Sequence, residues 1–247
     1  TDVVMANPGD TANEENQLAT YLSQSAGTTI AFGAATTIRG GLDSASTVRD
    51  VNQDGEPDLV VANGGFAAVS VVGGFAGGDF RHRVAVGADP RDVLLRDLNG
   101  DTKLDALVAN RFSQTVSVAA GDGAGHFNAL ASYACGQSVE SVGTLFVNGD
   151  TIPDIVVAST SSSNVGVLLG LAAGGYGTVT NNNVGTPVTA LIATDLNVDG
   201  QGELLAAHAA GNITILPAGT NLLTLGAADS LAASPVVSGQ PTILYAA

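Results

Sequence analysis

The sequence has little of several residue types, and each shortage argues against a class of protein. None of the 247 residues is tryptophan, and aromatic residues make up only 4% of the chain. Cys135 is the single cysteine, so an internal disulfide is excluded. We expect a small buried thiol there, with a reactive or intermolecular role as the alternative. No apolar run approaches the ~18 residues of a membrane-spanning helix, so direct membrane insertion is not expected.

Basic residues are also scarce. The chain has eight Lys and Arg residues against 23 Asp and Glu residues, which gives a formal net charge of −15. The eight basic residues form no basic stripe, and the sequence therefore argues against nucleic-acid binding.

Signatures of common catalytic sites are missing. The chain contains no G-x-S-x-G, C-x-x-C or P-loop motif. His82, His126 and His208 have no spacing suited to a metal site or a catalytic triad. We therefore expect no enzymatic activity in this chain, with an accessory domain of a larger secreted enzyme as an alternative reading.

The sequence does contain a nine-residue loop, followed by an apolar strand, that recurs four times. The loops span 50–58, 97–105, 146–154 and 195–203, so their first positions lie 47, 49 and 49 residues apart. Self-similarity at such a period indicates a repeat architecture. The alternative is that each loop is only a turn, since Asp, Asn and Gly favour turns without any ligand.

Oxygen-bearing side chains recur at positions 1, 3, 5 and 9 of this loop, and position 7 adds a backbone carbonyl. Calcium takes about six to eight oxygen ligands, whereas magnesium retains several waters and zinc prefers His and Cys. The predicted calcium ligands are Asp50, Asn52, Asp54, Asp58 and the carbonyl of Glu56; Asp97, Asn99, Asp101, Asp105 and the carbonyl of Lys103; and Asp195, Asn197, Asp199, Glu203 and the carbonyl of Gln201.

The third loop departs from the pattern because Phe146 occupies its first position. Its remaining candidates, Asn148, Asp150 and Asp154, are expected to bind weakly. The sequence thus predicts two to three Ca²⁺ sites and a weaker fourth. An EF-hand is excluded because its twelfth position requires Glu. Here that position is Val61, Val108, Val157 and Ala206.

The loops also account for much of the acidity. Eleven of the 23 acidic residues occupy their side-chain ligand positions, and without cations these carboxylates would repel one another. Calcium sites of modest affinity favour an extracellular or cell-surface location, with the periplasm as an alternative. The sequon beginning at Asn212 matters only in a eukaryotic secreted protein.

Short strand patterns surround each loop. In the second repeat, strands are predicted at Val48–Val51, Leu59–Ala62, Ala68–Val72 and Arg81–Val86. Glycine-rich turns lead to Phe80, Phe127 and Tyr176, which we expect to fill the outer edges of the sheets. Units of this length with four strands predict an all-β fold, a β-propeller of four-stranded antiparallel blades.

The repeats run end to end, so we expect a single propeller domain over residues 1–247. The predicted blades are 42–89, 90–137, 138–187 and 188–228, with a partial first blade at 1–41 and a partial last blade at 229–247. Strands are expected at Leu18–Ser23, Thr28–Ile38 and Thr242–Ala246. Both ends of the chain carry the same strand type, which favours an incomplete propeller; a compact five-bladed ring is the alternative.

The loops and the following strand, D-L-V-V-A-N at 58–63, resemble the FG-GAP/VCBS repeats of integrin-α-like β-propellers over nearly the whole chain. In that family, which usually closes with about seven blades, the cation loop joins the innermost strand of a blade to the second. The resemblance implies a non-catalytic extracellular scaffold for adhesion that binds another protein. A carbohydrate-binding lectin is the alternative, ranked lower because sugar sites favour aromatic platforms and this chain lacks Trp.

Overall fold

The computed structural model describes most of the repeat region. The described residues are 3–7, 17–21, 36–39, 43–73, 81–148, 150–159, 161–194, 203–208, 213–216, 223–225, 231–233 and 244–246. Within these ranges a single 3-10 turn, η1 (Gly64–Phe66), is the sole helical element. None of the described segments is a helix long and apolar enough to cross a membrane. The prediction of an all-β fold is confirmed.

The strands form successive antiparallel sheets in which neighbours in the chain are neighbours in space. The first sheet comprises β1 (Val3–Asn7), β2 (Gln17–Tyr21) and β3 (Thr36–Arg39). The second comprises β4 (Asp43–Arg49), β5 (Asp58–Asn63), β6 (Ala68–Val72) and β7 (Arg81–Ala85). The third comprises β8 (Pro90–Arg96), β9 (Asp105–Asn110), β10 (Thr115–Gly121) and β11 (Phe127–Ala134).

The second half of the chain continues this pattern. One sheet comprises β12 (Ser141–Leu145), β13 (Asp154–Ala158), β14 (Asn164–Leu168) and β15 (Thr180–Asn183). The next comprises β16 (Val188–Thr194), β17 (Glu203–His208), β18 (Ile213–Leu216) and β19 (Leu223–Leu225). The last is the pair β20 (Leu231–Ala233) and β21 (Leu244–Ala246). Four-stranded antiparallel sheets are thus confirmed, while their membership of one domain stays a prediction.

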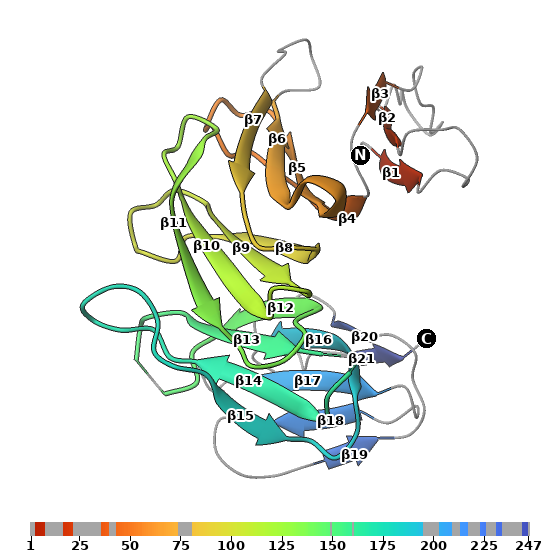
Figure 1. Ribbon diagram of the computed structural model, residues 1–247, viewed down its shortest axis with the longest axis vertical. Helices are drawn as coiled ribbons and strands as arrows, with labels where there is room; N and C mark the ends of the chain where they lie inside the picture. The colour runs from red at the N-terminus through yellow and green to blue at the C-terminus, as the bar shows by residue number, and fades with distance from the viewer. Residues whose placement is uncertain are drawn as a thin grey trace.

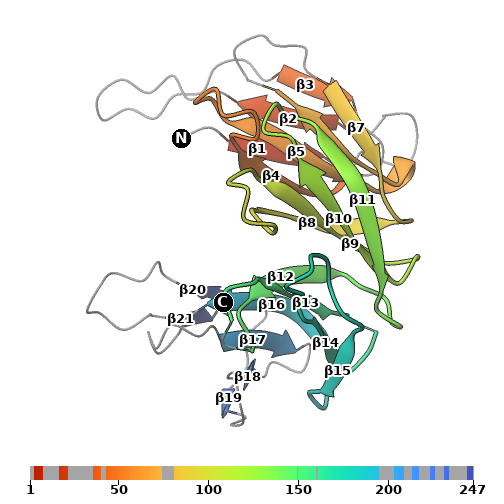
Figure 2. The ribbon, with the colours of Figure 1, turned by 90° about the vertical axis from the view of Figure 1, so that its left-hand side faces the viewer.

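The sheets follow one another through space as they do along the chain (Figures 1 and 2). Their first strands contact one another in sequence: β4 lies against β8, β8 against β12, β12 against β16, and β16 against β20. The described strands form separate sheets rather than one closed barrel. This order, with first strands innermost, is the arrangement of propeller blades.

Some predicted strand boundaries were wrong. β4 runs from Asp43 to Arg49, not over Val48–Val51, because Arg49 is already paired with Asp58 and Val51 lies in the loop. Tertiary register, rather than the apolar character of Val51, decides where this strand ends. Gln17 already belongs to β2, one residue before the predicted Leu18, and Arg39 still belongs to β3, one residue after the predicted Ile38. Residues 22–35 lie outside the described residues, so the predicted end of β2 and start of β3 stay predictions. Thr242 and Ile243 lie outside the described residues, so the predicted start of the last strand stays a prediction.

The core lies between the sheets, in layers that use both faces of each second strand. Val60 and Ala62 of β5 pack in a cluster shared with Val93 and Val108 of the next sheet, and Leu59 and Val61 pack on the opposite face. Two further clusters lie between the third and fourth and between the fourth and fifth sheets. Burial on both faces explains why these strands read as continuous apolar runs.

The turn aromatics belong to these layers. Phe127 is 2% exposed and packs in the cluster between the second and third sheets. Tyr176 packs beside Tyr133 against the next cluster, with the two rings edge to face at 5.5 Å. Both residues have the structural role expected of them, although they lie between sheets rather than only at an outer edge. Phe80 lies outside the described residues.

Candidate metal-binding loops

Each described loop joins the first strand of a sheet to the second, and its last carboxylate closes it. The N–H of Val51 donates to Asp58 Oδ2 at 2.9 Å, and the N–H of Leu98 donates to Asp105 Oδ2 at 2.9 Å. The equivalent bond of the third loop, from Val147 to Asp154 Oδ2, is 2.7 Å long. The position-9 carboxylates are buried at the mouth of the second strand, so they hold the two ends of the loop together.

Asp105 and Asp154 also accept a backbone N–H from outside their own hairpin, at the end of the third strand or just after it. Asp105 Oδ1 accepts the N–H of Gly121 at 2.9 Å, and Asp154 Oδ1 accepts that of Gly170 at 2.8 Å. A Cβ on Gly121 would lie 2.1 Å from the carbonyl oxygen of Leu104. Glycine therefore recurs here because the backbone approaches the loop too closely for any side chain.

Burial of the Asp105 carboxylate changes its acidity. Desolvation raises the pKa of Asp105 above the ordinary 3.8, the N–H donors of Gly121 and Leu98 oppose the rise, and the nearby Asp101 and Asp97 charges add to it. Like charges gathered at one loop favour either a proton or a cation.

The first loop folds around its own side chains. Asp50 Oδ2 accepts the N–H of Gly55 at 2.9 Å. Asn52 Oδ1 accepts the N–H of Asp54 at 3.0 Å, and the Asn52 amide donates to Asp54 Oδ2 at 2.9 Å. Asp54 Oδ1 in turn accepts the N–H of Glu56 at 2.8 Å. These bonds turn the side chains at positions 1, 3 and 5 toward the inside of one loop.

One atom of this loop is left without a partner. Asp50 Oδ1 is buried and accepts no hydrogen bond. A buried carboxylate oxygen without a donor is costly, and such an atom calls for a water or an ion as its partner. The donor set of the first loop therefore fits a calcium ion, with Asp50 Oδ1 as the oxygen that a cation would satisfy.

The second loop repeats this hydrogen bonding. Asp97 Oδ1 accepts the N–H of Gly100 at 2.7 Å, and Asp97 Oδ2 accepts that of Thr102 at 2.8 Å. Asn99 Oδ1 accepts the N–H of Asp101 at 2.8 Å, and Asp101 Oδ1 accepts that of Lys103 at 3.0 Å. Lys103 also places its ammonium 3.9 Å from Asp101 Oδ2, so an intramolecular cation stands beside one candidate ligand.

The third loop keeps the fold of the others without an oxygen at its first position. Asn148 Oδ1 accepts the N–H of Asp150 at 3.1 Å, and Asp150 Oδ1 accepts that of Ile152 at 2.8 Å. The Arg96 guanidinium instead lies over the Phe146 ring, 5.3 Å from the ring centroid. The loop can therefore form without a first ligand, and weak binding there stays a prediction.

The fourth loop is described only at its end. Glu203 begins β17, is 5% exposed and pairs with Thr194 across the hairpin. Asp195, Asn197, Asp199 and Gln201 lie outside the described residues.

In the three described loops the predicted ligands of each loop lie near one another, but their carboxylates do not by themselves form a metal site. Among the residues that the structure places, no three His, Cys, Asp or Glu side chains form a metal-binding group. The predicted sets also rely on Asn and on a backbone carbonyl. Calcium binding in these loops stays a prediction.

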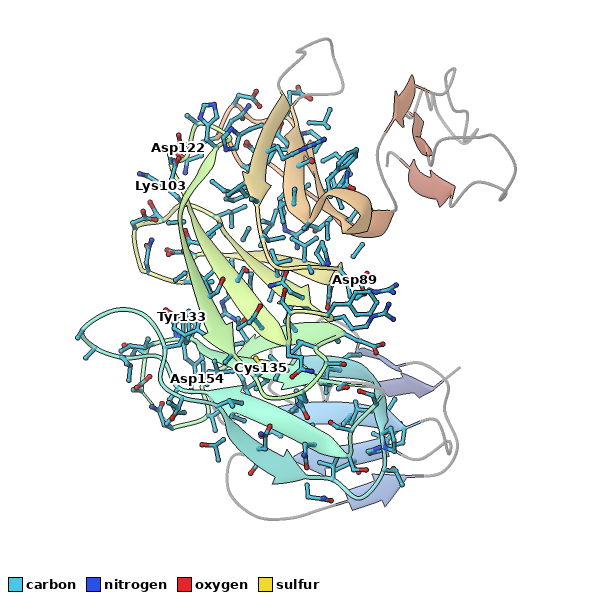
Figure 3. All side chains as sticks on the ribbon, viewed as in Figure 1. Asp89, Lys103, Asp122, Tyr133, Cys135 and Asp154 are labelled. Atoms are coloured by element: carbon cyan, nitrogen blue, oxygen red, sulfur yellow. The ribbon has the colours of Figure 1, made fainter. Side chains whose placement is uncertain are left out.

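The histidines have structural surroundings. His208 is buried, and it bonds Thr214 Oγ1 at 2.8 Å and the carbonyl of Thr186 at 3.0 Å. The His82 and His126 rings meet edge to face at 4.8 Å, and His126 Nδ1 lies 2.9 Å from Asp122 Oδ2. Asp122 and Lys103 lie at the opposite end of the β8–β11 strands from Asp89 (Figure 3).

Sequence reasoning missed a group of residues at the opposite ends of the strands. Phe66 and Phe112 are 53% and 70% exposed, in the turns between the second and third strands of successive sheets. An available signal was their position: each follows the Asn that ends the repeated apolar strand, Asn63 and Asn110, by two or three residues.

The comparisons with known proteins concern the fold alone. No protein-family model and no curated protein matches this sequence. A lectin of Agrocybe aegerita that recognises non-reducing terminal N-acetylglucosamine is similar in structure, with a TM-score of 0.56 and 18% identity over 90% of this chain. BBS1N, in a complex with ARL6DN, has a TM-score of 0.62 and 12% identity over 93% of this chain. The Vibrio cholerae biofilm matrix protein Bap1 has a TM-score of 0.56 and 14% identity over 94% of this chain.

This chain spans only part of each of those structures, with 65% of the lectin, 71% of BBS1N and 41% of Bap1 covered. At such low identity the likeness carries no function across. Successive four-stranded antiparallel sheets and these likenesses together place the chain among proteins with a β-propeller-like fold.

Proposed function

We propose that this chain is a non-catalytic, extracellular binding module whose repeated loops hold calcium and whose sheets present a surface to another protein. The observation that carries the calcium part is the buried Asp50 Oδ1, which has no hydrogen-bond partner inside a loop lined by further oxygen atoms. The recurrence of the same closed loop in successive sheets supports it.

Calcium would act on stability rather than on chemistry. A cation bound only by the folded loop stabilises the fold by RT ln(1 + [L]/Kd), about 2.7 kcal/mol when calcium is at a hundredfold excess over Kd. In this chain the gain would come from relief of repulsion among the loop carboxylates. Burial is the main cause of the raised pKa of Asp105, and the nearby Asp101 and Asp97 charges add to it.

The binding role is supported by the kinds of proteins that share the fold. They are a lectin, a protein in complex with another protein, and a biofilm matrix protein. Two of the three are described as binding a sugar or another protein, which is consistent with an interaction domain. The resemblance of the loops to integrin-α-like repeats favours a protein partner.

Carbohydrate binding is the second candidate, and one observation favours it. The scarcity of aromatic residues counted against a sugar site, yet Phe66 and Phe112 are well exposed, and a lectin shares the fold. A glycan array separates the two functions. Specific binding to one glycan class, lost in Phe112→Ser, would favour a lectin over a protein-binding scaffold.

Calcium binding is tested by thermal unfolding of the whole chain with calcium and with a chelator. We expect the chelator to lower Tm, and Asp54→Ala and Asp101→Ala each to remove part of the calcium-dependent gain. Asp122→Ala is the matched control, because it removes the same charge from an Asp outside the predicted ligand sets. Phe146→Asp should add to the gain by completing the third loop. A Tm that calcium does not change in any variant would refute the proposal.

A further inference from the structure

At the strand ends opposite the candidate metal-binding loops, an arginine side chain stacks on each of two exposed aromatic rings. The Arg83 guanidinium lies 4.3 Å from the centroid of the Phe66 ring, and that of Arg111 lies 4.5 Å from the Phe112 centroid. A guanidinium stacked on a ring keeps the N–H donors at its edge available for a planar anion. We call Phe66, Arg83, Asp89, Arg91, Arg111 and Phe112 the Arg–Phe face.

Asp89 fixes two of these arginines. Its Oδ2 accepts the Nε–H of Arg91 at 3.2 Å and also the Nε–H of Arg111. The Asp89 side chain is 16% exposed, whereas those of Arg91 and Arg111 are 36% and 28% exposed. The carboxylate lies beneath the two guanidinium groups and holds their positions, which lowers the entropic cost of binding a ligand.

Backbone hydrogen bonds join the two halves of the face. In the connection between β7 and β8, the N–H of Val86 donates to the carbonyl of Ala67, one residue after Phe66, at 2.8 Å. Farther along, the N–H of Phe112 donates to the carbonyl of Ala88 at 3.2 Å. The turns that carry the two Phe residues are therefore tied to one short connection.

The charge of this part of the chain is unlike the rest. Residues 81–111 contain six of the eight basic residues but only five of the 23 acidic ones. Three of the six belong to the Arg–Phe face. Lys103 and Arg96 lie toward the other ends of the strands, beside Asp101 and Thr144. An otherwise acidic protein thus presents a small cationic surface with apolar rings beside it.

We propose that the Arg–Phe face binds an acidic segment of a partner protein. Arg and aromatic residues are enriched at the centres of protein interfaces, where a few of them contribute most of the affinity. Arg91 and Arg111 would pair with carboxylates of the partner, and the Phe rings would exclude water from those pairs. The proposal rests on the proposed protein-binding function and specifies the chemistry of its partner.

The same residues favour a peptide over a sugar. A pyranose ring stacks on a free aromatic face, whereas here a guanidinium already covers one face of each ring. An acidic peptide needs only the outward donors of the arginines and the edges of the rings.

The test measures binding of poly-L-glutamate to the whole chain at low ionic strength, in calcium-free buffer and again with calcium. A net charge of −15 opposes nonspecific binding of any polyanion. We expect saturable binding that weakens about tenfold in Arg111→Gln and in Phe112→Ser. Arg49→Gln is the matched control, because it removes one positive charge at the loop end of β4 and should leave affinity unchanged.

Further binding measurements distinguish an acidic peptide from an acidic glycan as the ligand. Polygalacturonate carries carboxylates on a glycan, so binding to it alone, or to it as strongly as to poly-L-glutamate, would overturn the proposal of an acidic peptide. Absence of binding, or equal losses in Arg111→Gln and Arg49→Gln, would overturn it as well. Asp54→Ala should bind poly-L-glutamate normally, so failure of the calcium loops and failure of this face are distinguishable.

Discussion

Two residues of each complete loop adopt a left-handed backbone, and the sequence places glycine at a different one each time. In the first loop Gln53 has φ 62° and Gly55 has φ 91°. In the second loop Gly100 has φ 82° and Thr102 has φ 70°. The sequence shows that Thr102 replaces a glycine. It does not show that the two loops share one backbone conformation, because a different residue type adopts each positive φ in the two loops.

Glycine at the two non-glycine positions should stabilise the fold. A residue with a Cβ is strained at positive φ, so Gln53→Gly and Thr102→Gly are each expected to raise the free energy of unfolding by about 0.5–1 kcal/mol. Urea unfolding in the presence of a chelator measures this without a contribution from metal. The reverse change Gly100→Ala should destabilise, and a stabilising Gly100→Ala would contradict the shared backbone.

The buried thiol gives a prediction about pH. Cys135 is 0% exposed, and burial raises the pKa of its thiol from 9.0 to about 11. Because the folded pKa is raised, the stability contributed by the neutral thiol is complete below pH 9.0 and is lost as the pH rises through 11.

Cys135→Ala lacks this titration. The stability of the natural chain relative to Cys135→Ala should fall by roughly 3 kcal/mol across that pH window. Urea unfolding of both proteins over the same pH range measures the difference. A constant difference would show that the thiol titrates alike in the folded and unfolded chains.

At the scale of the strand, burial on both faces makes the second strand of each sheet the most sensitive element. Leu107 of β9 is 0% exposed and packs with Ile155 of the next sheet. Leu107→Ala is expected to lower the free energy of unfolding by about 2–5 kcal/mol. Leu171→Ala is the matched control, since Leu171 is 45% exposed and should change stability by less than about 0.5 kcal/mol. Similar losses in both would contradict this packing.

The loop carboxylates should divide into two groups by their response to calcium. Asp154 accepts backbone N–H bonds from Val147 and Gly170, which follow different strands of its sheet, so Asp154→Ala should cost about 2 kcal/mol or more, equally with calcium and with chelator. Asp54→Ala should cost much more with calcium than with chelator, because Asp54 bonds only within its own exposed loop. Equal calcium dependence of the two losses would contradict this division.

Much of the second strand and of the loop before it could be predicted from the sequence, but the ends of the strands could not. The continuous apolar run of Leu59–Ala62 indicated a buried strand, and the Asp before it indicated a loop. The role of Asp58 as the acceptor that closes the loop could not be predicted, because the loop pattern identifies an acidic side chain but not its hydrogen-bond donor. β4 was misplaced for the same reason: its end is set by pairing across the hairpin.

At the scale of the whole molecule, the repeat period was the strongest predictor. A spacing of 47 to 49 residues with four strand patterns predicted successive four-stranded sheets, which the structure contains. The Arg–Phe face was not predicted because it is assembled from turns of two sheets and the connection between them. Its residues lie up to 46 positions apart, from Phe66 to Phe112, and no local pattern joins them.

The central claim is that each complete loop gathers its oxygen atoms around one calcium ion. Crystals of this chain grown with calcium, and an anomalous difference map calculated from them, test it most directly. The account predicts peaks inside the Asp50 and Asp97 loops, bounded by their position 1, 3 and 5 oxygens, with Asp50 Oδ1 as a ligand. A well-ordered first loop without a peak, with Asp50 Oδ1 bonded to a water instead, would contradict it.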